Sequence, residues 1–227
     1  MKTLRTDRHF ITSRTVAVIV AHPDDETLWA GGTILMHPRW QCSVLSLCRA
    51  SDAERAPRFY RAIERLGASG AMADLEDGPD QMPAAESDLR ETIQKFTDGN
   101  HFDLVLSHGP RGEYTRHRRH EEVSKTVLAL WREGRLDAGT MAFFAYSDDG
   151  RSHLPLPEKN AHFRNPLPAA IVDAKREIIT TIYGFAPESW EARTTPTEEA
   201  FWIFESPAAA SVWVNKKMRD HESPCSV

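Results

Sequence analysis

The chain has 227 residues and a mass of 25.6 kDa, with 41% hydrophobic and 27% charged residues, values that are ordinary for a water-soluble globular protein. Its formal net charge is -5 and its pI is near 6.1, which excludes the basic footprint of a nucleic-acid-binding protein. We therefore expect no nucleic-acid partner and a single domain over 1–227, with a core over about 14–206 and a C-terminal tail over about 207–227.

The first 14 residues, MKTLRTDRHFITSR, carry charge but lack the apolar centre of a secretory signal, which predicts a cytoplasmic protein. No run in the chain approaches the roughly 20 apolar residues that cross a bilayer, so no membrane span is expected. Cys42, Cys48 and Cys225 form no CxxC pair, and the first two share one face of an expected strand, where packing is their expected role. The sequence leaves the oligomeric state open, with a homo-oligomer as one option.

Short apolar runs alternate with helical patterns along the chain. Strands buried on both faces are expected at 16–20, 43–47 and 102–106, with further strands at 69–78, 140–147 and 199–206. Helices are expected at 28–36, 53–67, about 84–96, 121–134 and 173–185. Residues 148–168 lack periodicity and predict a long surface loop. The alternation predicts an α/β fold with a mostly parallel sheet and helices on both faces.

Polar residues crowd together directly after the first expected strand. The string AHPDDE places His22, Pro23 and three acids, Asp24 to Glu26, at the end of an apolar run. Ligands of open parallel sheets bind beyond the carboxyl ends of the strands, which is where these residues fall. One acid would cap the following helix well, and capping is the simpler interpretation. Three acids and a histidine exceed what a cap needs, so we favour a divalent metal that compensates their charge.

A second polar segment, SHGPRGEYTRHRRH, follows the expected strand at 102–106. His117 and His120 are three residues apart and share a helix face, and the apolar stripe of the following helix continues backward from Val123 onto His120. We therefore expect His120 to point toward the sheet, with His108, at the strand end, as the competing ligand. Two histidines and one carboxylate with an open fourth position are typical of catalytic zinc.

The string AHPDDE after a buried strand, the Gly-Gly pair in the following helix and the downstream GEYxxHxxH resemble the PIG-L/LmbE-like family of zinc-dependent deacetylases. Members of that family remove acetyl groups from N-acetylglucosamine-containing substrates on a Rossmann-like fold, and the similarity covers most of the chain. The family usually has Gly-His-Pro-Asp-His where residues 116–120 of this chain read Arg-His-Arg-Arg-His. An acid of the family pattern is thus replaced by Arg119, and Tyr114 is displaced by one residue.

The resemblance implies roles for five residues. His22, Asp25 and His120 would bind one zinc ion per chain, although another divalent metal is an open alternative. Asp24 would be the general base that takes a proton from water, and His117 would assist as a cation. Asp24 or His117 would then protonate the departing amine. The implied activity is metal-dependent hydrolysis of a linear amide C–N bond.

Further residues near the expected site have less specific assignments. Glu26 either holds a ligand from behind or only begins the helix. Because Arg118 and Arg119 lie on one turn with His117, we expect repulsion to lower the pKa of His117. The arginines at 116, 118 and 119 would either steer an anionic substrate or lie in solvent. Residues that would contact substrate or support the site, each with a surface or core role as its alternative, are Trp29, Arg55, Asp77, His108, Arg111, Glu113 and Tyr114.

The expected function is zinc-dependent removal of an N-acetyl group from an amino sugar of the N-acetylglucosamine type or its conjugate. One alternative is an amidohydrolase of the same fold that acts on a non-sugar N-acyl substrate, and another is a non-catalytic carbohydrate or metal binder. A binder requires neither Asp24 nor His117, which counts against it. A magnesium site for phosphoryl transfer is a further alternative, but the chain lacks an Asp-x-Asp-x-Thr pattern and a Gly-rich phosphate loop.

Overall fold

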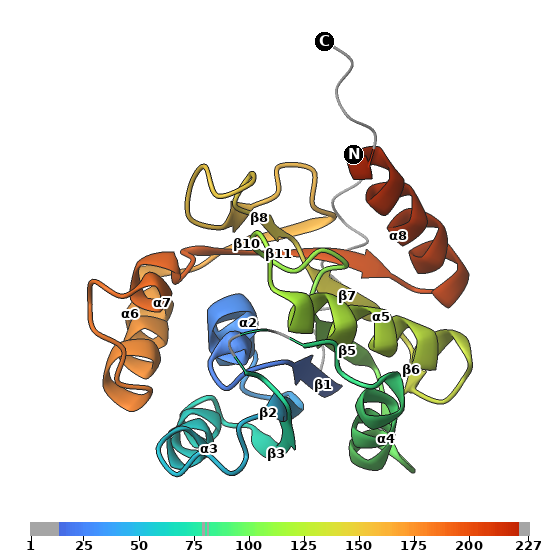
Figure 1. Cartoon of the computed structure of the whole chain (residues 1–227). Helices are drawn as coiled ribbons and strands as arrows, with labels where there is room; N and C mark the ends of the chain where they lie inside the picture. The colour runs from blue at the N-terminus through green and yellow to red at the C-terminus, as the bar shows by residue number, and fades with distance from the viewer. Residues whose placement is uncertain (1–13, 79, 81, 223–227) are drawn as a thin grey trace.

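A seven-stranded sheet forms the centre of the protein in a computed structural model that describes residues 14–78, 80 and 82–222 (Figure 1). Its strands are β1 (Thr15–Val20), β2 (Gln41–Cys48), β3 (Ser69–Leu75), β5 (Leu104–Ser107), β7 (Met141–Phe144), β10 (Phe163–Pro166) and β11 (Glu198–Phe204). The order across the sheet is β10-β11-β7-β5-β1-β2-β3. Neighbours from β7 to β3 are parallel, whereas β11 is antiparallel to both β7 and β10. The prediction of an α/β fold with a mostly parallel sheet is confirmed.

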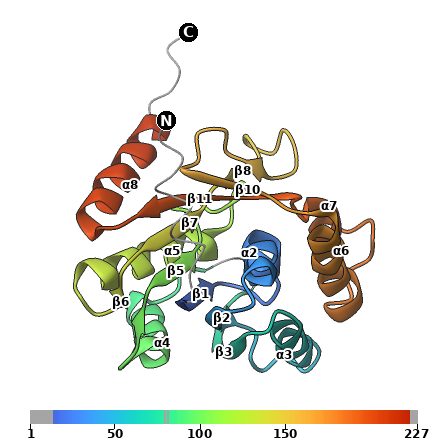
Figure 2. The same cartoon turned by 180° about the vertical axis from the view of Figure 1, so that it is seen from behind.

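Helices cover both faces of the sheet, as the front and rear views show (Figures 1 and 2). One face carries α2 (Asp25–Met36), α3 (Arg55–Arg65), α6 (Ala169–Glu177) with its π-helical continuation η1 (Ile178–Ile182), and α7 (Trp190–Thr194). The other face carries α4 (Glu86–Thr97), α5 (Arg118–Arg132) and α8 (Pro207–Glu222). No described helix combines the length and apolar character that a membrane span requires.

The two faces have separate hydrophobic cores, and β1 contributes to both. Val16, Val18 and Val20 pack with α2, α3 and η1, whereas Ala17 and Ile19 pack with α4 and α5. Successive side chains of a strand point to opposite faces, so a strand covered on both sides must be apolar at every position. This explains the uninterrupted apolar run that predicted β1.

A buried ion pair fixes α2 against the antiparallel edge of the sheet. Glu199 of β11 pairs with Lys175 of α6 at 2.7 Å, and both side chains are fully buried. The same carboxylate accepts the backbone N–H groups of Gly32 and Thr33 at 2.8 and 2.7 Å. A Cβ at position 32 would lie 2.4 Å from a methyl carbon of Leu167, so this glycine allows the close approach. The second half of α2 is thereby tied to β11 and, through the ion pair, to α6.

Several predicted boundaries are wrong. The strand expected at 102–106 is interrupted at Asp103, whose carboxylate accepts the backbone N–H of Thr15 at 2.9 Å. This leaves a short strand β4 (His101–Phe102), paired with β6 (Asp137–Ala138), before β5. The first helix begins at Asp25 rather than residue 28, so two of the acids belong to its first turn. The strand expected at 140–147 is divided into β7 and β8 (Tyr146–Ser147).

The segment expected as a long loop, 148–168, contains two strands. β9 (Leu156–Pro157) pairs with β8, and β10 extends the main sheet at its edge. Only alternate residues of β10 face the protein, and Pro166 ends it, which is tolerated at an edge strand. β10 was not predicted because a strand this short and polar contains no apolar run.

The expected C-terminal tail contains a helix up to Glu222. α8 packs against α5 and β11, with Ala210 buried and Trp213 against Trp202 at a centroid distance of 5.0 Å. The cytoplasmic location inferred from the first 14 residues rests almost entirely on positions outside the described residues, as does the assignment of Cys225. Cys42 and Cys48 are buried in the core, as predicted.

Candidate metal centre and active site

The two polar motifs meet at the carboxyl edge of the sheet. β1 lies between β2 and β5, because the chain passes from β1 to β2 on one side and later returns from β3 to β5 on the other. The carboxyl ends of β1 and β5 therefore flank the point where the strand order reverses, the place where open α/β sheets bind ligands. His22 follows β1, and His108 follows β5 directly. α5 begins immediately after His117.

Three donor atoms form a nearly equilateral triangle at this edge. Nδ1 of His22 lies 3.2 Å from Oδ2 of Asp25 and 3.3 Å from Nε2 of His120, and the latter two atoms are 3.3 Å apart. Ligands at about 2.0–2.1 Å from a tetrahedral zinc ion are separated by about 3.3–3.4 Å. The three atoms thus have the spacing of one face of a zinc tetrahedron.

A carboxylate behind each histidine determines which ring nitrogen faces the triangle. Nε2 of His22 donates to Oδ1 of Asp77 at 3.0 Å, and Nδ1 of His120 donates to Oε2 of Glu113 at 2.6 Å. These bonds hold a proton on the outer nitrogen of each ring and turn the other nitrogen toward the ion site. Arg49 holds Asp77 in turn, with Nε and Nη2 at 3.2 and 3.0 Å from Oδ2.

Opposite charges prevail over burial in setting the pKa values of His120 and Glu113. Burial disfavours a charged His120, but Asp25 and Glu113 outweigh it and raise the pKa of His120 to about 10. Burial likewise disfavours a charged Glu113, yet His108 and His120 lower the pKa of this carboxyl to about 2. The surface role considered for Glu113 is wrong, because its side chain is fully buried. No spacing in the sequence distinguishes this glutamate from a surface one.

His108, the competing ligand, uses both ring nitrogens within the protein. Nε2 accepts the backbone N–H of Ala21 at 2.9 Å, which requires the proton to be on Nδ1, and Nδ1 donates to Glu113 at 2.9 Å. Burial, together with the charge of His120, lowers the pKa of His108, in keeping with a neutral ring. Among the described residues, Nε2 of His120 contacts only the other two corners of the triangle, so His120 is the candidate ligand once its proton is lost, and His108 supports Glu113.

Asp24 and Asp25 differ in every contact although they are neighbours. Asp24 precedes α2 with φ 131° and makes no side-chain capping bond, so the simple cap considered from the sequence is not formed. Burial, followed by the charges of Asp25 and Glu26, raises the pKa of Asp24 well above its usual range. Burial acts in the same direction on Asp25, but His120 and His108 outweigh it and lower its pKa. Paired carboxyls with divergent pKa values are typical of acid–base sites.

Glu26 and Trp29 support these two aspartates from the core. Glu26 is buried and accepts the backbone N–H of Asp24 at 3.1 Å and the O–H of Tyr183 at 2.7 Å. Trp29 is fully buried, so it has a core position that excludes contact with substrate, and its indole N–H donates to Oδ1 of Asp25 at 3.0 Å. The second Asp25 oxygen remains directed at the triangle.

His117 lies beside the triangle. Its ring centroid is 4.6 Å from that of His22 and 4.4 Å from that of His120. Nδ1 of His117 is buried and has no hydrogen-bond partner among the described residues. Burial, followed by the charges of His120 and His22, lowers the pKa of His117 to about 3. The ring is therefore neutral at neutral pH, in contrast to the cation expected from the sequence.

The arginines around His117 are not the main cause of its low pKa, although their repulsion was the expected cause. Arg119 is only 2% exposed and donates to Glu122. Arg116 pairs with Glu121 at 2.5 and 2.6 Å. The expected direction of the shift is confirmed, but burial and the neighbouring histidines produce it.

A cavity of about 190 Å³ opens beside the donor triangle. It is lined by His22, Pro23, Asp24, Asp25, Leu28, Arg49, Arg55, Asp77, Tyr114, His117, Trp190 and Glu191. Of the residues expected near the substrate, Arg55, Asp77 and Tyr114 line this cavity, whereas Arg111 lies in other hollows with Glu158. No motif in the sequence indicates that Arg49, Trp190 or Glu191 belongs to the site.

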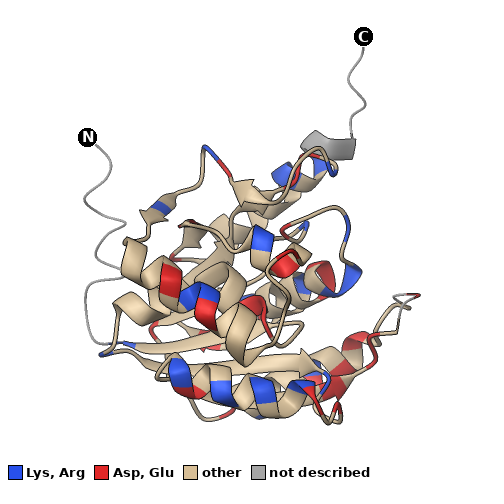
Figure 3. Cartoon of the chain, turned by 90° about the vertical axis from the view of Figure 1, so that its left-hand side faces the viewer, with Lys and Arg blue, Asp and Glu red and all other residues tan. Residues whose placement is uncertain are grey.

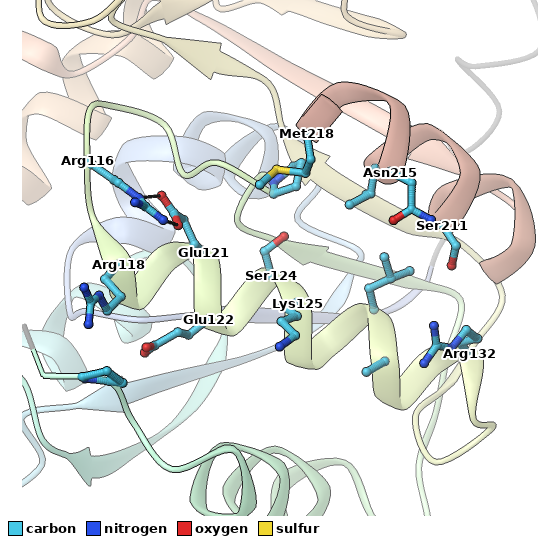
Figure 4. A pocket seen from close by; sticks show the side chains of 15 residues that line it. Arg116, Arg118, Glu121, Glu122, Ser124, Lys125, Arg132, Ser211, Asn215 and Met218 are labelled. Carbon is cyan, nitrogen blue, oxygen red and sulfur yellow. Dashed lines mark hydrogen bonds and ion pairs between the residues drawn. The ribbon is translucent and has the colours of Figure 1, made fainter. Parts of the chain in front are cut away.

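A larger groove of about 620 Å³ lies between α5 and α8 (Figure 4). Its side chains include the ion pair of Arg116 with Glu121 at one end and Arg132 at the other. No histidine and no fully buried carboxylate lines this groove within the described part of the chain. The smaller cavity is therefore the candidate active site. On another side of the molecule, acidic and basic residues are interspersed along the helices (Figure 3).

The fold and the donor triangle define a class of protein, namely α/β proteins with a candidate mononuclear metal centre at the switch point of the sheet. The sequence profile of the GlcNAc-PI de-N-acetylase (PIG-L) family matches residues 17–131, just over half of the chain and the part that contains both motifs. The chain belongs to this family. No curated protein matches the chain in sequence.

Solved structures share the fold at low sequence identity. N,N′-diacetylchitobiose deacetylase from Pyrococcus horikoshii is 16% identical, with a TM-score of 0.67 and coverage of 87% of this chain and 86% of that one. The deacetylase of the A40926 pseudoaglycone is 14% identical, with a TM-score of 0.60 and coverage of 85% and 98%. The 4-carboxy-2-hydroxymuconate hydratase of Pseudomonas putida KT2440 is 18% identical, with a TM-score of 0.56 and coverage of 94% and 92%.

Proposed function

We propose that this protein is a zinc-dependent N-deacetylase that hydrolyses the acetamide of an N-acetylglucosamine-type sugar or its conjugate. The observation that carries the proposal is the donor triangle of His22, Asp25 and His120, with Asp24 and His117 lining the same cavity. Membership of a family named for de-N-acetylation, and the deacetylases among the similar structures, support the reaction type.

The donor set favours zinc over magnesium. Two imidazole nitrogens and one carboxylate oxygen suit zinc, whereas magnesium prefers oxygen ligands, which argues against the phosphoryl-transfer alternative. His22, Asp25 and His120 would hold the ion, and Asp77 and Glu113 would orient the two imidazoles. A bound zinc ion supplies the Lewis acidity that activates a water molecule and polarises an amide carbonyl.

Asp24 acts as the general base. Its carboxylate faces the cavity but makes no capping bond, and its nearest charged partner is Nη1 of Arg55 at 4.0 Å. Asp24 takes a proton from the attacking water as the new C–O bond forms, and returns it to the nitrogen as the C–N bond breaks. The products are acetate and a primary amine. A raised pKa suits a carboxyl that must both accept and donate this proton.

His117 stabilises the oxygen of the attacked carbonyl. The low pKa of His117 makes its imidazole neutral, so it acts as a hydrogen-bond donor rather than as a cation. A donor aimed at the oxygen where negative charge develops lowers the barrier, because its hydrogen bond is stronger in the transition state than in the ground state. Nδ1 of His117 has no hydrogen-bond partner among the described residues, so the ring is not committed to a contact within that part of the protein.

Acetate release tests this function directly. The purified protein is loaded with zinc and offered N-acetylglucosamine, N,N′-diacetylchitobiose and N-acetylated amines without a sugar, each with and without a chelator. We expect acetate from the sugars, with loss of activity on chelation and recovery with zinc. Turnover of the non-sugar amides alone would favour the amidohydrolase alternative. Absence of acetate from every substrate would refute deacetylation and favour a binder or a hydratase, since a hydratase shares this fold.

A further inference from the structure

Helix α7 supplies one wall of the candidate active site from a part of the chain outside the family match. Trp190 and Glu191 are its first two residues, and both line the cavity. The α7 backbone is held by a cap, because Oγ of Ser189 accepts the backbone N–H of Ala192 at 3.1 Å. The Trp190 ring packs edge-on against Tyr114 with centroids 4.6 Å apart. The backbone that carries the side chains of Trp190 and Glu191 is therefore held in place.

Glu191 presents a carboxylate that the protein itself does not use. Among the residues that the structure describes, this carboxylate makes no hydrogen bond or ion pair, and the side chain is only half-buried. Its negative charge contributes to raising the pKa values of Asp24 and Tyr114, which places it close to both. A carboxylate accepts hydrogen bonds through two oxygens, so Glu191 can accept several donors from a ligand.

Trp190 presents partly exposed aromatic surface beside that carboxylate. Its ring packs against the core formed with α2 and η1 but is not fully buried. A pyranose ring has an apolar face of C–H groups and a rim of hydroxyl donors, and an aromatic ring next to a carboxylate complements both. A simple aliphatic acetamide has neither feature.

On the basis of the proposed function, we propose that Trp190 and Glu191 bind the pyranose ring that carries the acetamide. The ring packs on the indole of Trp190, and its hydroxyl groups donate to the carboxylate of Glu191. The α7 wall thereby selects sugar acetamides over small acyclic ones, while the donor triangle and Asp24 perform the hydrolysis. An anionic substituent next to Glu191 is disfavoured by its charge.

Steady-state kinetics on two substrates test the selectivity. N-acetylglucosamine and N-acetylethanolamine are compared on the zinc-loaded enzyme and its variants. Trp190→Ala should raise KM for the sugar about tenfold, with little change in kcat and none in KM for N-acetylethanolamine, and Trp190→Phe should restore most of the loss. Glu191→Gln should also raise KM for the sugar alone. Glu188→Gln, an exposed neighbour outside the cavity, and Trp213→Ala on α8 are the matched controls.

Equilibrium binding separates this proposal from the proposed function. Calorimetry on Asp24→Asn measures the affinity for N-acetylglucosamine without turnover. The double variant Asp24→Asn/Trp190→Ala should bind N-acetylglucosamine about tenfold more weakly than Asp24→Asn. This result would support sugar binding by α7 even if the parent enzyme released no acetate. Unchanged affinity, or equal KM changes for both substrates, would overturn the α7 proposal while leaving acetate release to decide the function.

Discussion

Asp24 and Asp25 have different environments because the backbone turns into α2 at Asp24. Asp24 has φ 131°, a conformation that a residue with a side chain rarely adopts, and Asp25 begins α2. Such backbone strain is retained mainly where function requires it. The result is one carboxylate that faces the two imidazoles and one that faces the cavity.

The two aspartates should separate metal binding from catalysis. Asp24→Asn is expected to retain zinc but lose about 10²-fold or more in kcat, the usual contribution of a positioned base. Asp25→Asn should lose most of the zinc, because one corner of the donor triangle becomes an amide. Metal content by atomic absorption and acetate release are measured on the same preparations. Equal loss of zinc in both variants would contradict the division of roles.

The sequence predicted the position of these residues, and it named their supports only as residues near the site, without the side chain that each one contacts. AHPDDE at a strand end is a local signal, so His22, Asp24 and Asp25 could be named from it. Asp77 and Glu113 contact the two histidines only because the sheet brings distant segments together, and no local pattern encodes that. The protonation of His117 was predicted wrongly because burial dominates its pKa, and the burial of a side chain cannot be predicted from the adjacent residues in the sequence.

At the scale of elements, Arg119 connects the start of α5 to the segment between β3 and α4. Its guanidinium donates to the backbone carbonyl oxygen of Glu76 and to that of Met82, the latter at 3.3 Å, as well as to Glu122. Glu76 directly precedes Asp77, the residue behind His22. The arginine that departs from the family pattern is therefore a structural connection close to the site.

Replacing Arg119 should affect stability more than the pH profile. Arg119→Asp removes these bonds and buries a carboxylate beside Glu122, so we expect a loss of about 2–4 kcal/mol in the free energy of unfolding, measured by urea denaturation. The alkaline limb of kcat/KM should stay in place, because Arg119 is not a main cause of the low pKa of His117. Arg118→Asp, at an exposed position of the same turn, is the control and should cost far less. A stable Arg119→Asp enzyme with a displaced limb would instead restore the expectation from the sequence.

Elements were predictable from sequence where burial alone specifies them. β1 and β2 are covered on both faces and appear as apolar runs, and α5 has a clear apolar stripe. β10 and α7 are short and half-exposed, so their residues carry no comparable pattern. Part of the candidate substrate wall belongs to this second group, which is why it was missed.

At the scale of the whole molecule, the donor triangle joins segments that are far apart in the chain. His22 and His120 are separated by 98 positions. An ion bound by both would hold β1 against the start of α5 and would favour the folded state over the unfolded chain. The protonation of His120 makes this stabilisation depend on pH.

Zinc should stabilise the protein increasingly as pH rises from about 6.5 to 8.5. Without metal, the pKa of His120 is about 10, so the folded protein holds a proton that zinc must displace, and the apparent Kd should fall about tenfold per pH unit. The same raised pKa stabilises the metal-free fold below the unfolded value of about 6.5, and this contribution declines as pH rises toward 10. The gap between the Tm values with and without zinc should therefore widen.

Thermal melts with zinc and with chelator at several pH values measure this gap, and calorimetry in buffers of different ionisation enthalpy counts the released protons. His120→Ala should abolish most of the zinc-dependent rise in Tm. His153→Ala, at an exposed histidine of the 148–168 segment, should retain it. A gap that stays constant with pH, or that survives in His120→Ala, would exclude His120 as a ligand.

The location of α7 has a consequence for how substrate binding in this protein can evolve. His22, Asp24, Asp25, His117 and His120 all fall within residues 17–131, whereas Trp190 and Glu191 come from a turn well beyond them. No hydrogen bond in the described structure joins these two side chains to the five residues. Under the proposed function, a substitution at Trp190 would therefore change sugar binding while leaving the five residues of the metal and proton-transfer site unchanged.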